Sequence, residues 1–216
     1  MKNLKFKIPY ISLILLFTSF IFINIISYST EVSSEISDEV LRLHVIANSD
    51  SDEDQNLKYI VRDAVLEYMT TCAKDAKNKS EVLSILNDNI EEIRQIALNT
   101  VKTYNYNYNI NLEIGNFLFP TKTYGDISLP SGYYDALKIV IGNGEGKNWW
   151  CVMFPPLCFV DVSSGIVPEE SKNQLEASLS KESFNLVSTE QPNKINIKFK
   201  LVELWQSVKF MATKTK

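Results

Sequence analysis

The stretch "RLHVIANSDSDEDQNLK", Arg42 to Lys58, joins the pattern of a strand to the pattern of a helix start. Side chains alternate over residues 40–47, which predicts a strand with two distinct faces. One face carries Leu41, Leu43 and Val45, and the other carries Arg42, His44 and Ile46. Ser51 followed by Asp54 has the spacing of a capping box, and acidic residues favour the positive end of a helix. The stretch therefore predicts a strand that leads directly into a helix.

Helical and strand patterns alternate along the rest of the chain. Apolar residues recur at helical spacing over residues 52–71 and 80–103. Strand patterns follow at 103–114, with an interruption expected at Gly115-Asn116, and in "YYDALKIVIGNGEGKNWWCVMFPPLCFVDV" and "KINIKFK". The glycine-rich "GNGEGK" predicts a hairpin turn, and residues 119–132 predict a long loop. We expect an α+β fold, with a two-helix layer on a mainly antiparallel sheet.

The first 29 residues differ from the rest. Three lysines precede "IPYISLILLFTSFIFINIIS", which carries no charge and has the pattern of an export signal. Ser27 and Ser29 suit a cut after Ser29, but the apolar run is also nearly long enough to span a membrane, so an anchor through residues 8–26 is the alternative. We expect a linker at 30–37, a single globular domain at 38–210 with a polar segment at 163–193, and a tail at 211–216.

Composition and motif spacing argue against several functions. A net charge of -4 and an isoelectric point near 5.2 disfavour a nucleic-acid binder. "GNGEGK" departs from the phosphate-binding loop because Asn148 replaces its hydroxyl residue and an apolar strand follows. Zinc ligation by His44, Cys151 and Cys158 lacks the usual short cysteine spacing. We expect no metal and no cofactor.

Two motifs leave functional alternatives open. His44, the one histidine of the chain, lies before Asn48, Asp50 and Asp52, which suits either an acid/base site or a strand that leads into a capped helix. We prefer the second interpretation. "NWWCVMFPPLCFV" predicts either strands buried on both faces or an exposed aromatic patch that includes Trp149 and Trp150. A disulfide between Cys151 and Cys158 suits an exported protein, whereas two buried thiols are the alternative. Cys72 lies on an apolar helix face and is expected to be a buried thiol.

Several stretches together resemble the stage II sporulation protein R family. They are "DEVLRLHVIANSDSDEDQNLKYIVRDAVL", "FPTKTYGDISLPSGYYDALKIVIGNGEGKNWWCVMFPPLCFVD" and "IKFKLVELW". The resemblance covers nearly all of the chain outside the N-terminal segment and residues 163–193. It implies a protein exported from the forespore into the intermembrane space, which activates a membrane-embedded aspartic protease, stage II sporulation protein GA, that processes pro-sigma-E in the mother cell.

The resemblance implies an activator without catalytic residues. The expected partner-binding residues lie in its two most unusual motifs, "RLHVIANSDS" and "GKNWWCVMFPPLCFVD". They are Arg42, His44, Asn48, Asp50, Trp149 and Trp150. The alternative is an exported hydrolase that uses His44 with nearby carboxylates. An activator requires an exposed apolar or aromatic patch, whereas a hydrolase requires a pocket that contains His44 and a carboxylate.

Overall fold

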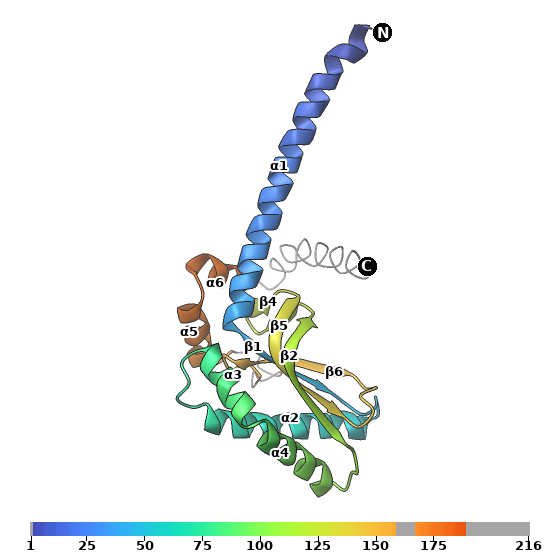
Figure 1. Cartoon of the computed structure of the whole chain (residues 1–216), viewed down its shortest axis with the longest axis vertical. Coiled ribbons are helices and arrows are strands. Elements are labelled where there is room, and N and C mark those ends of the chain that lie inside the picture. Colours follow the sequence, from blue (N-terminus) through green and yellow to red (C-terminus); the bar gives the residue numbers. More distant parts are fainter. Residues whose placement is uncertain (1, 159–166, 189–216) are drawn as a thin grey trace.

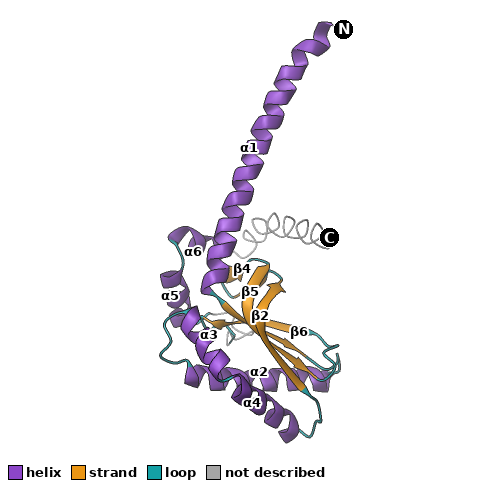
Figure 2. Cartoon of the chain, viewed as in Figure 1, coloured by secondary structure: helices purple, strands orange, loops and turns teal. Residues whose placement is uncertain are grey.

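A four-stranded sheet with a different apolar cluster on each face forms the centre of the molecule (Figures 1 and 2). The structure is a computed structural model, and it describes residues 2–158 and 167–188. The helices are α1 (Lys2–Glu39), α2 (Asp52–Cys72), α3 (Lys79–Asp88), α4 (Ile90–Thr103), α5 (Glu169–Ser178) and α6 (Lys181–Val187). The strands are β1 (Leu41–Ile46), β2 (Ile110–Phe119), β3 (Lys122–Tyr124), β4 (Ile127–Leu129), β5 (Gly132–Ile141) and β6 (Asn148–Phe154). The expected α+β class is confirmed.

The strand order of the main sheet is β2-β5-β1-β6. β1 is parallel to β5 and antiparallel to β6, and β2 is antiparallel to β5, so the sheet is mainly antiparallel. The expected hairpin between β5 and β6 is wrong, because β1 lies between these strands. Residues 142–147 instead carry the chain across the end of β1, where the backbone N–H groups of Glu145 and Gly146 donate to the carbonyl oxygens of Asn48 and Ala47.

Helices α2, α3 and α4 cover one face of the sheet. The expected helix at 52–71 is confirmed, whereas the one expected at 80–103 is divided into α3 and α4 at Asn89. The Tyr68 hydroxyl donates to Oδ1 of Asn89 at 2.8 Å, which ties the division to α2. Leu43 and Val45 of β1 and Leu137 and Ile139 of β5 point into this layer. The helices therefore pack on the face that the sequence predicted as apolar.

Strand β2 occupies a different range from the one expected. Helix α4 continues to Thr103, so Tyr104, Tyr106 and Tyr108 precede the strand. No bulge occurs at Gly115, because the register between β2 and β5 is unbroken. The apolar positions change phase for another reason: Leu112 points to the helical layer, whereas Phe119 points to the opposite face, which the described part of the chain covers at that end.

The second apolar cluster lies on the opposite face, at one end of the sheet. It combines the C-terminal part of α1, the β3–β4 hairpin, α5 and α6. The loop expected at 119–132 therefore contains a hairpin. The linker expected at 30–37 is helical, and its Val32 and Ile36 are buried. Glu35 also accepts hydrogen bonds from both Ser180 and Ser183 of the α6 start, so this segment is part of the domain.

Some sequence predictions fall wholly or partly outside the described residues. The strand "KINIKFK" and the tail 211–216 lie there completely. Within the polar segment 163–193 the structure describes residues 167–188, which form α5 and α6. In the described part of the chain, no helix meets the combined length and apolarity needed to cross a membrane.

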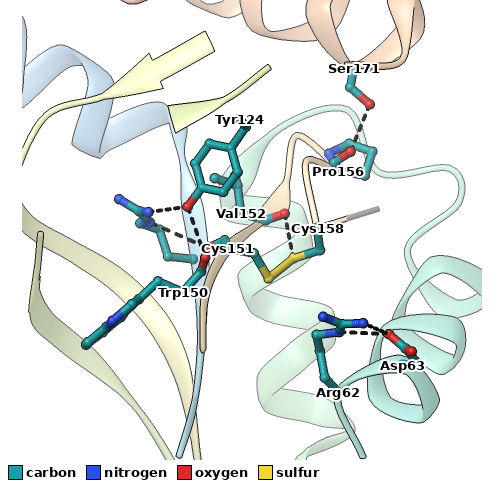
Figure 3. The surroundings of a disulfide bond; sticks show 10 residues. Arg62, Asp63, Tyr124, Trp150, Cys151, Val152, Pro156, Cys158 and Ser171 are labelled. Atoms are coloured by element: carbon teal, nitrogen blue, oxygen red, sulfur yellow. Dashed lines mark hydrogen bonds and ion pairs between the residues drawn. A yellow bond between two sulfur atoms is a disulfide. The ribbon is translucent and has the colours of Figure 1, made fainter. Parts of the chain in front are cut away.

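A disulfide joins Cys151 of β6 to Cys158 (Figure 3). The two Cα atoms are 5.0 Å apart, and both side chains are buried. The bridge closes the corner at Pro155 and Pro156, whose carbonyl oxygen accepts from the Ser171 hydroxyl of α5. Cys72 is half-buried at the end of α2 and is a free thiol. Both cysteines belong to the apolar cluster on the helical face, whereas their neighbours Val152 and Leu157 belong to the second cluster.

Reduction of this bridge should lower the free energy of unfolding by about 2 kcal/mol, because the disulfide reduces the conformational entropy of the unfolded chain. Denaturant unfolding with and without reductant measures the change. Cys72→Ser should unfold like the wild type under both conditions. A bridge to Cys72 in the mass spectrum of the non-reduced protein would contradict the assignment.

Candidate functional site

The residues after β1 bind the loop between β5 and β6. Oδ1 of Asn48 accepts from the backbone of Asn143 at 3.0 Å, and Oδ1 of Asp50 accepts from the backbone of Lys147 at 2.7 Å. These two contacts, with the backbone hydrogen bonds of residues 47 and 48, form what we call the loop clamp. Its role is to hold two chain segments together across the end of the sheet.

Asp54 and Ser51 complete the clamp at the start of α2. The Ser51 hydroxyl accepts from the Asp54 backbone at 3.2 Å, which confirms the expected N-cap. Oδ2 of Asp54 accepts from Asn48 at 2.8 Å and from the Ser49 hydroxyl at 2.6 Å. Burial opposes ionisation of Asp54, but these hydrogen bonds outweigh it and lower its pKa. The carboxylate is therefore engaged in structure.

Lys58 also binds the loop between β5 and β6. Its side chain is buried, and Nζ donates to Oε1 of Gln55 at 2.6 Å and to the carbonyl oxygen of Lys147 at 3.2 Å. Burial lowers the pKa of this amine. The polar side chains between Asn48 and Lys58 thus hold residues 142–147 in place through hydrogen bonds.

Glycine is required where the two segments touch. Gly142 and Gly144 have φ angles of 58° and 67°, in the region that favours glycine. A Cβ at Gly146 would lie 2.2 Å from the Ser49 carbonyl oxygen, too close for any side chain. The glycines of "GNGEGK" therefore allow the loop to approach the backbone of residues 47–49 closely, and the loop forms hydrogen bonds with that backbone.

His44 lies on the opposite side of β1 from the helical layer and is 6 % exposed. Its Nε2 donates to Oδ1 of Asn148 at 2.7 Å, and its ring stacks on Trp150 with centroids 3.5 Å apart. Burial lowers the pKa of His44 to about 4, although the Asn148 hydrogen bond opposes this shift. The ring is neutral near pH 7, and its hydrogen-bond partner is an amide, so it lacks the orienting carboxylate of an acid/base site.

Arg42 is fully buried on the same face of β1. Nη2 donates to the Tyr124 hydroxyl at 2.6 Å, and the guanidinium carbon lies 4.4 Å from the Phe119 ring centroid and 4.8 Å from that of Tyr134. The Tyr124 hydroxyl in turn donates to the Trp150 carbonyl oxygen (Figure 3). Arg42 therefore links the β3–β4 hairpin to the main sheet, and its Nη1 has no hydrogen-bond partner among the described residues.

The two tryptophans lie on opposite sides of β6. Trp149 packs at the helical side, with the Arg62 guanidinium 4.4 Å from its ring and Tyr59 edge-on at 5.2 Å. Trp150 covers His44 and contacts Phe119, with ring centroids 4.7 Å apart. The six expected partner-binding residues therefore do not form one surface. Arg42 and His44 are buried, and Asn48 and Asp50 belong to the loop clamp. Trp149 and Trp150 lie on opposite sides of the sheet.

A surface that the sequence analysis missed surrounds Trp150, and we call it the open face. Its apolar part is Ile46, Val140 and Trp150, all half-buried, and its polar part is Asn111, Glu113, Lys138 and Asn148. The pairing register puts these residues on one side of the sheet, since directly paired residues share a face. The described helices on this side pack at its other end, against residues such as Tyr134 and Ala136 (Figure 1).

A cavity of about 320 Å³ lies elsewhere, between the end of α2, the end of β6 and α5. Leu66, Met69, Met153 and Cys158 line it, with Lys74 and Glu170 among its polar groups. His44 and Asp50 are not among the lining residues. No group of three metal-ligating side chains occurs in the residues that the structure describes. The pocket that a His44 hydrolase requires is therefore not provided by this cavity.

Gly146→Ala should destabilise the protein by about 1–3 kcal/mol, because the new Cβ meets the Ser49 backbone in the loop clamp. Thermal and denaturant unfolding measure the loss. Gly115→Ala is the matched control, since its nearest contact is the movable end of the Phe117 ring at 3.2 Å. Equal effects of the two substitutions would show that the clamp is not tightly packed.

Stability should fall as the pH drops from about 6.5 to about 4 because of His44. Its pKa is lower in the folded state than in the unfolded chain, so protons bind the unfolded chain more readily and favour unfolding as the pH drops. The slope should approach about 1.4 kcal/mol per pH unit. His44→Gln should lack this component, and identical pH profiles for the two proteins would contradict the burial of a neutral ring.

Comparison with known proteins gives one consistent result. The model of the stage II sporulation protein R family matches residues 37–164, which include both unusual motifs. The chain is 42 % identical over 139 residues to a protein named stage II sporulation protein R from Bacillus subtilis (strain 168). That match covers 64 % of the chain and 62 % of the relative, and no solved structure matches significantly. Since the family model matches more than half of the sequence, the chain belongs to the stage II sporulation protein R family.

Proposed function

We propose that this protein is an exported signal that binds and activates a membrane-embedded aspartic protease of the stage II sporulation protein GA type. Activation then leads to pro-sigma-E processing in the mother cell. The family supports the sporulation role, and the open face is the observation that supports binding. Trp150 there is an aromatic anchor held rigidly on His44, and rigid aromatic side chains are typical of binding hot spots.

Activation would operate by differential binding. A protein that binds the active state of a protease more tightly than the inactive state increases the active population. A change from mostly inactive to mostly active requires about 5 kcal/mol of differential affinity, which a few well-packed anchors supply. The buried Arg42 and His44 would contribute by positioning Trp150 and the β3–β4 hairpin beside the open face.

Export would place the domain in the intermembrane space. The lysines and the uncharged run of the N-terminal segment support this proposal, because they have the pattern of an export signal. The disulfide between two buried cysteines also suits an oxidising compartment outside the cytoplasm. The net charge of -4 disfavours a nucleic-acid partner.

Titration of the purified protein against the membrane-reconstituted protease should show saturation near equal amounts, because an activator acts by occupancy. His44→Gln should retain most of the activation at saturating concentration. Val140→Lys should weaken activation about tenfold or more, since it places a charge on the open face. Leu118→Lys is the matched control, because Leu118 is an exposed apolar residue on the opposite side of the sheet.

Two outcomes of this titration oppose the proposal. Full activation at far less than stoichiometric amounts, lost in a His44→Gln protein that still binds, would indicate an enzyme. Equal activation by the Val140→Lys and Leu118→Lys variants would remove the open face as the contact surface. Cleavage of pro-sigma-E in the same reconstitution provides the readout for both.

Deletion of residues 1–29 should leave a folded, soluble domain but abolish signalling in sporulating cells, because the protein is not exported. Deletion of residues 1–39 should in addition prevent stable folding, since it removes the buried Val32 and Ile36. Circular dichroism and sigma-E processing distinguish the two effects. Normal processing with a cytoplasmic product of the shorter deletion would refute the need for export.

A further inference from the structure

Charge is divided unevenly between the body of the chain and its C-terminal segment. Residues 30–188 contain 24 acidic and 13 basic side chains, a net charge of -11. Residues 189–216 contain six lysines and two glutamates, a net charge of +4. From here on the word tail means this whole segment, which includes residues 211–216. Opposite net charges on linked segments favour their association at moderate ionic strength.

The tail begins on the side of the sheet that carries the open face. Ser188, the last described residue before it, forms a β-bridge with Ile127 of β4. Ile127 belongs to the second apolar cluster, which covers the adjacent end of the same sheet face. Four strands span about 15 Å, and an extended chain covers that distance in about five residues. The 28 residues of the tail are therefore more than long enough to cross the open face.

The sequence of the tail is complementary to the open face. In "KINIKFK", Ile195, Ile197 and Phe199 alternate with polar residues, so an extended segment there has one apolar side. The open face offers Ile46, Val140 and Trp150. At its rim Glu113 of the edge strand β2, 56 % exposed at its side chain, forms an ion pair with Lys138 of the same face. Apolar contact would bury Ile46, Val140 and Trp150, while the tail lysines stay at the rim and are attracted by the net negative charge of the body.

We propose that the tail of this chain docks in cis on the open face of the sheet. Docking removes Ile46, Val140 and Trp150 from water, which accounts for apolar side chains on a sheet face that the described helices leave uncovered. It also neutralises part of the acidic charge of the body. This inference does not rest on the proposed function, although a partner that binds the open face would have to displace the tail.

Thiol labelling of the full-length protein in neutral detergent tests the proposal. In a Cys72→Ser background, Val140→Cys introduces a thiol on the open face and Leu118→Cys introduces one on the opposite side. Lys194, Lys198 and Lys200 are then all replaced by Glu to repel the tail. We expect this replacement to accelerate maleimide labelling at position 140 by fivefold or more and to leave the rate at position 118 unchanged. Truncation after Ser188 should give the same result.

Each other outcome of the labelling experiment is decisive. Equal labelling rates with and without the lysine replacements and the truncation would overturn the proposal. Protection at position 140 that increases with protein concentration would identify a second copy as the occupant and would also overturn docking in cis. Faster labelling at both positions would also overturn the proposal, because the protection given by the tail would then not be specific to the open face. Because no protease is present, these results are independent of the test of activation.

Discussion

The loop clamp determines the order of the strands and, through it, the environment of most of the polar residues in the core. Residues 142–147 pass over the end of β1 and bind Asn48 and Asp50, so β6 returns on the far side of β1. β1 is therefore an inner strand, and the side chains packed on each side of the sheet bury both of its faces. Arg42 and His44 are buried for this reason, although they alternate with apolar residues.

Burial of these polar side chains requires partners, and the neighbouring strands supply them. Oδ1 of Asn148 of β6 accepts a hydrogen bond from His44, and the Tyr124 hydroxyl of the β3–β4 hairpin accepts one from Arg42. Aromatic rings fill the remaining space, because Phe119, Tyr134 and Trp150 pack around both side chains. Residues that have the chemistry of an active site therefore serve to hold the second face of the sheet together, and the surface they support is the open face.

Membership of the stage II sporulation protein R family is consistent with this arrangement. The family match spans the sheet, the helical layer and the loop clamp, and ends before α5. The two unusual motifs of the sequence meet in the clamp and in the pairing of β1 with β6. The two motifs are far apart in the sequence but adjacent in the structure. Both contribute residues to the open face, Ile46 from the first motif and Trp150 from the second.

The sequence by itself determined the features that depend on local periodicity. These are the strand of Arg42 and His44, the cap at Ser51, the helical layer and the α+β class. The family resemblance rests instead on the two unusual motifs. Only the tertiary structure decided the strand order, the start of β2 at Ile110 and the burial of Val32 and Ile36. The physical reason is that side-chain alternation specifies two faces of a strand, whereas the neighbour of each strand and the cover of each face depend on contacts between residues distant in the chain.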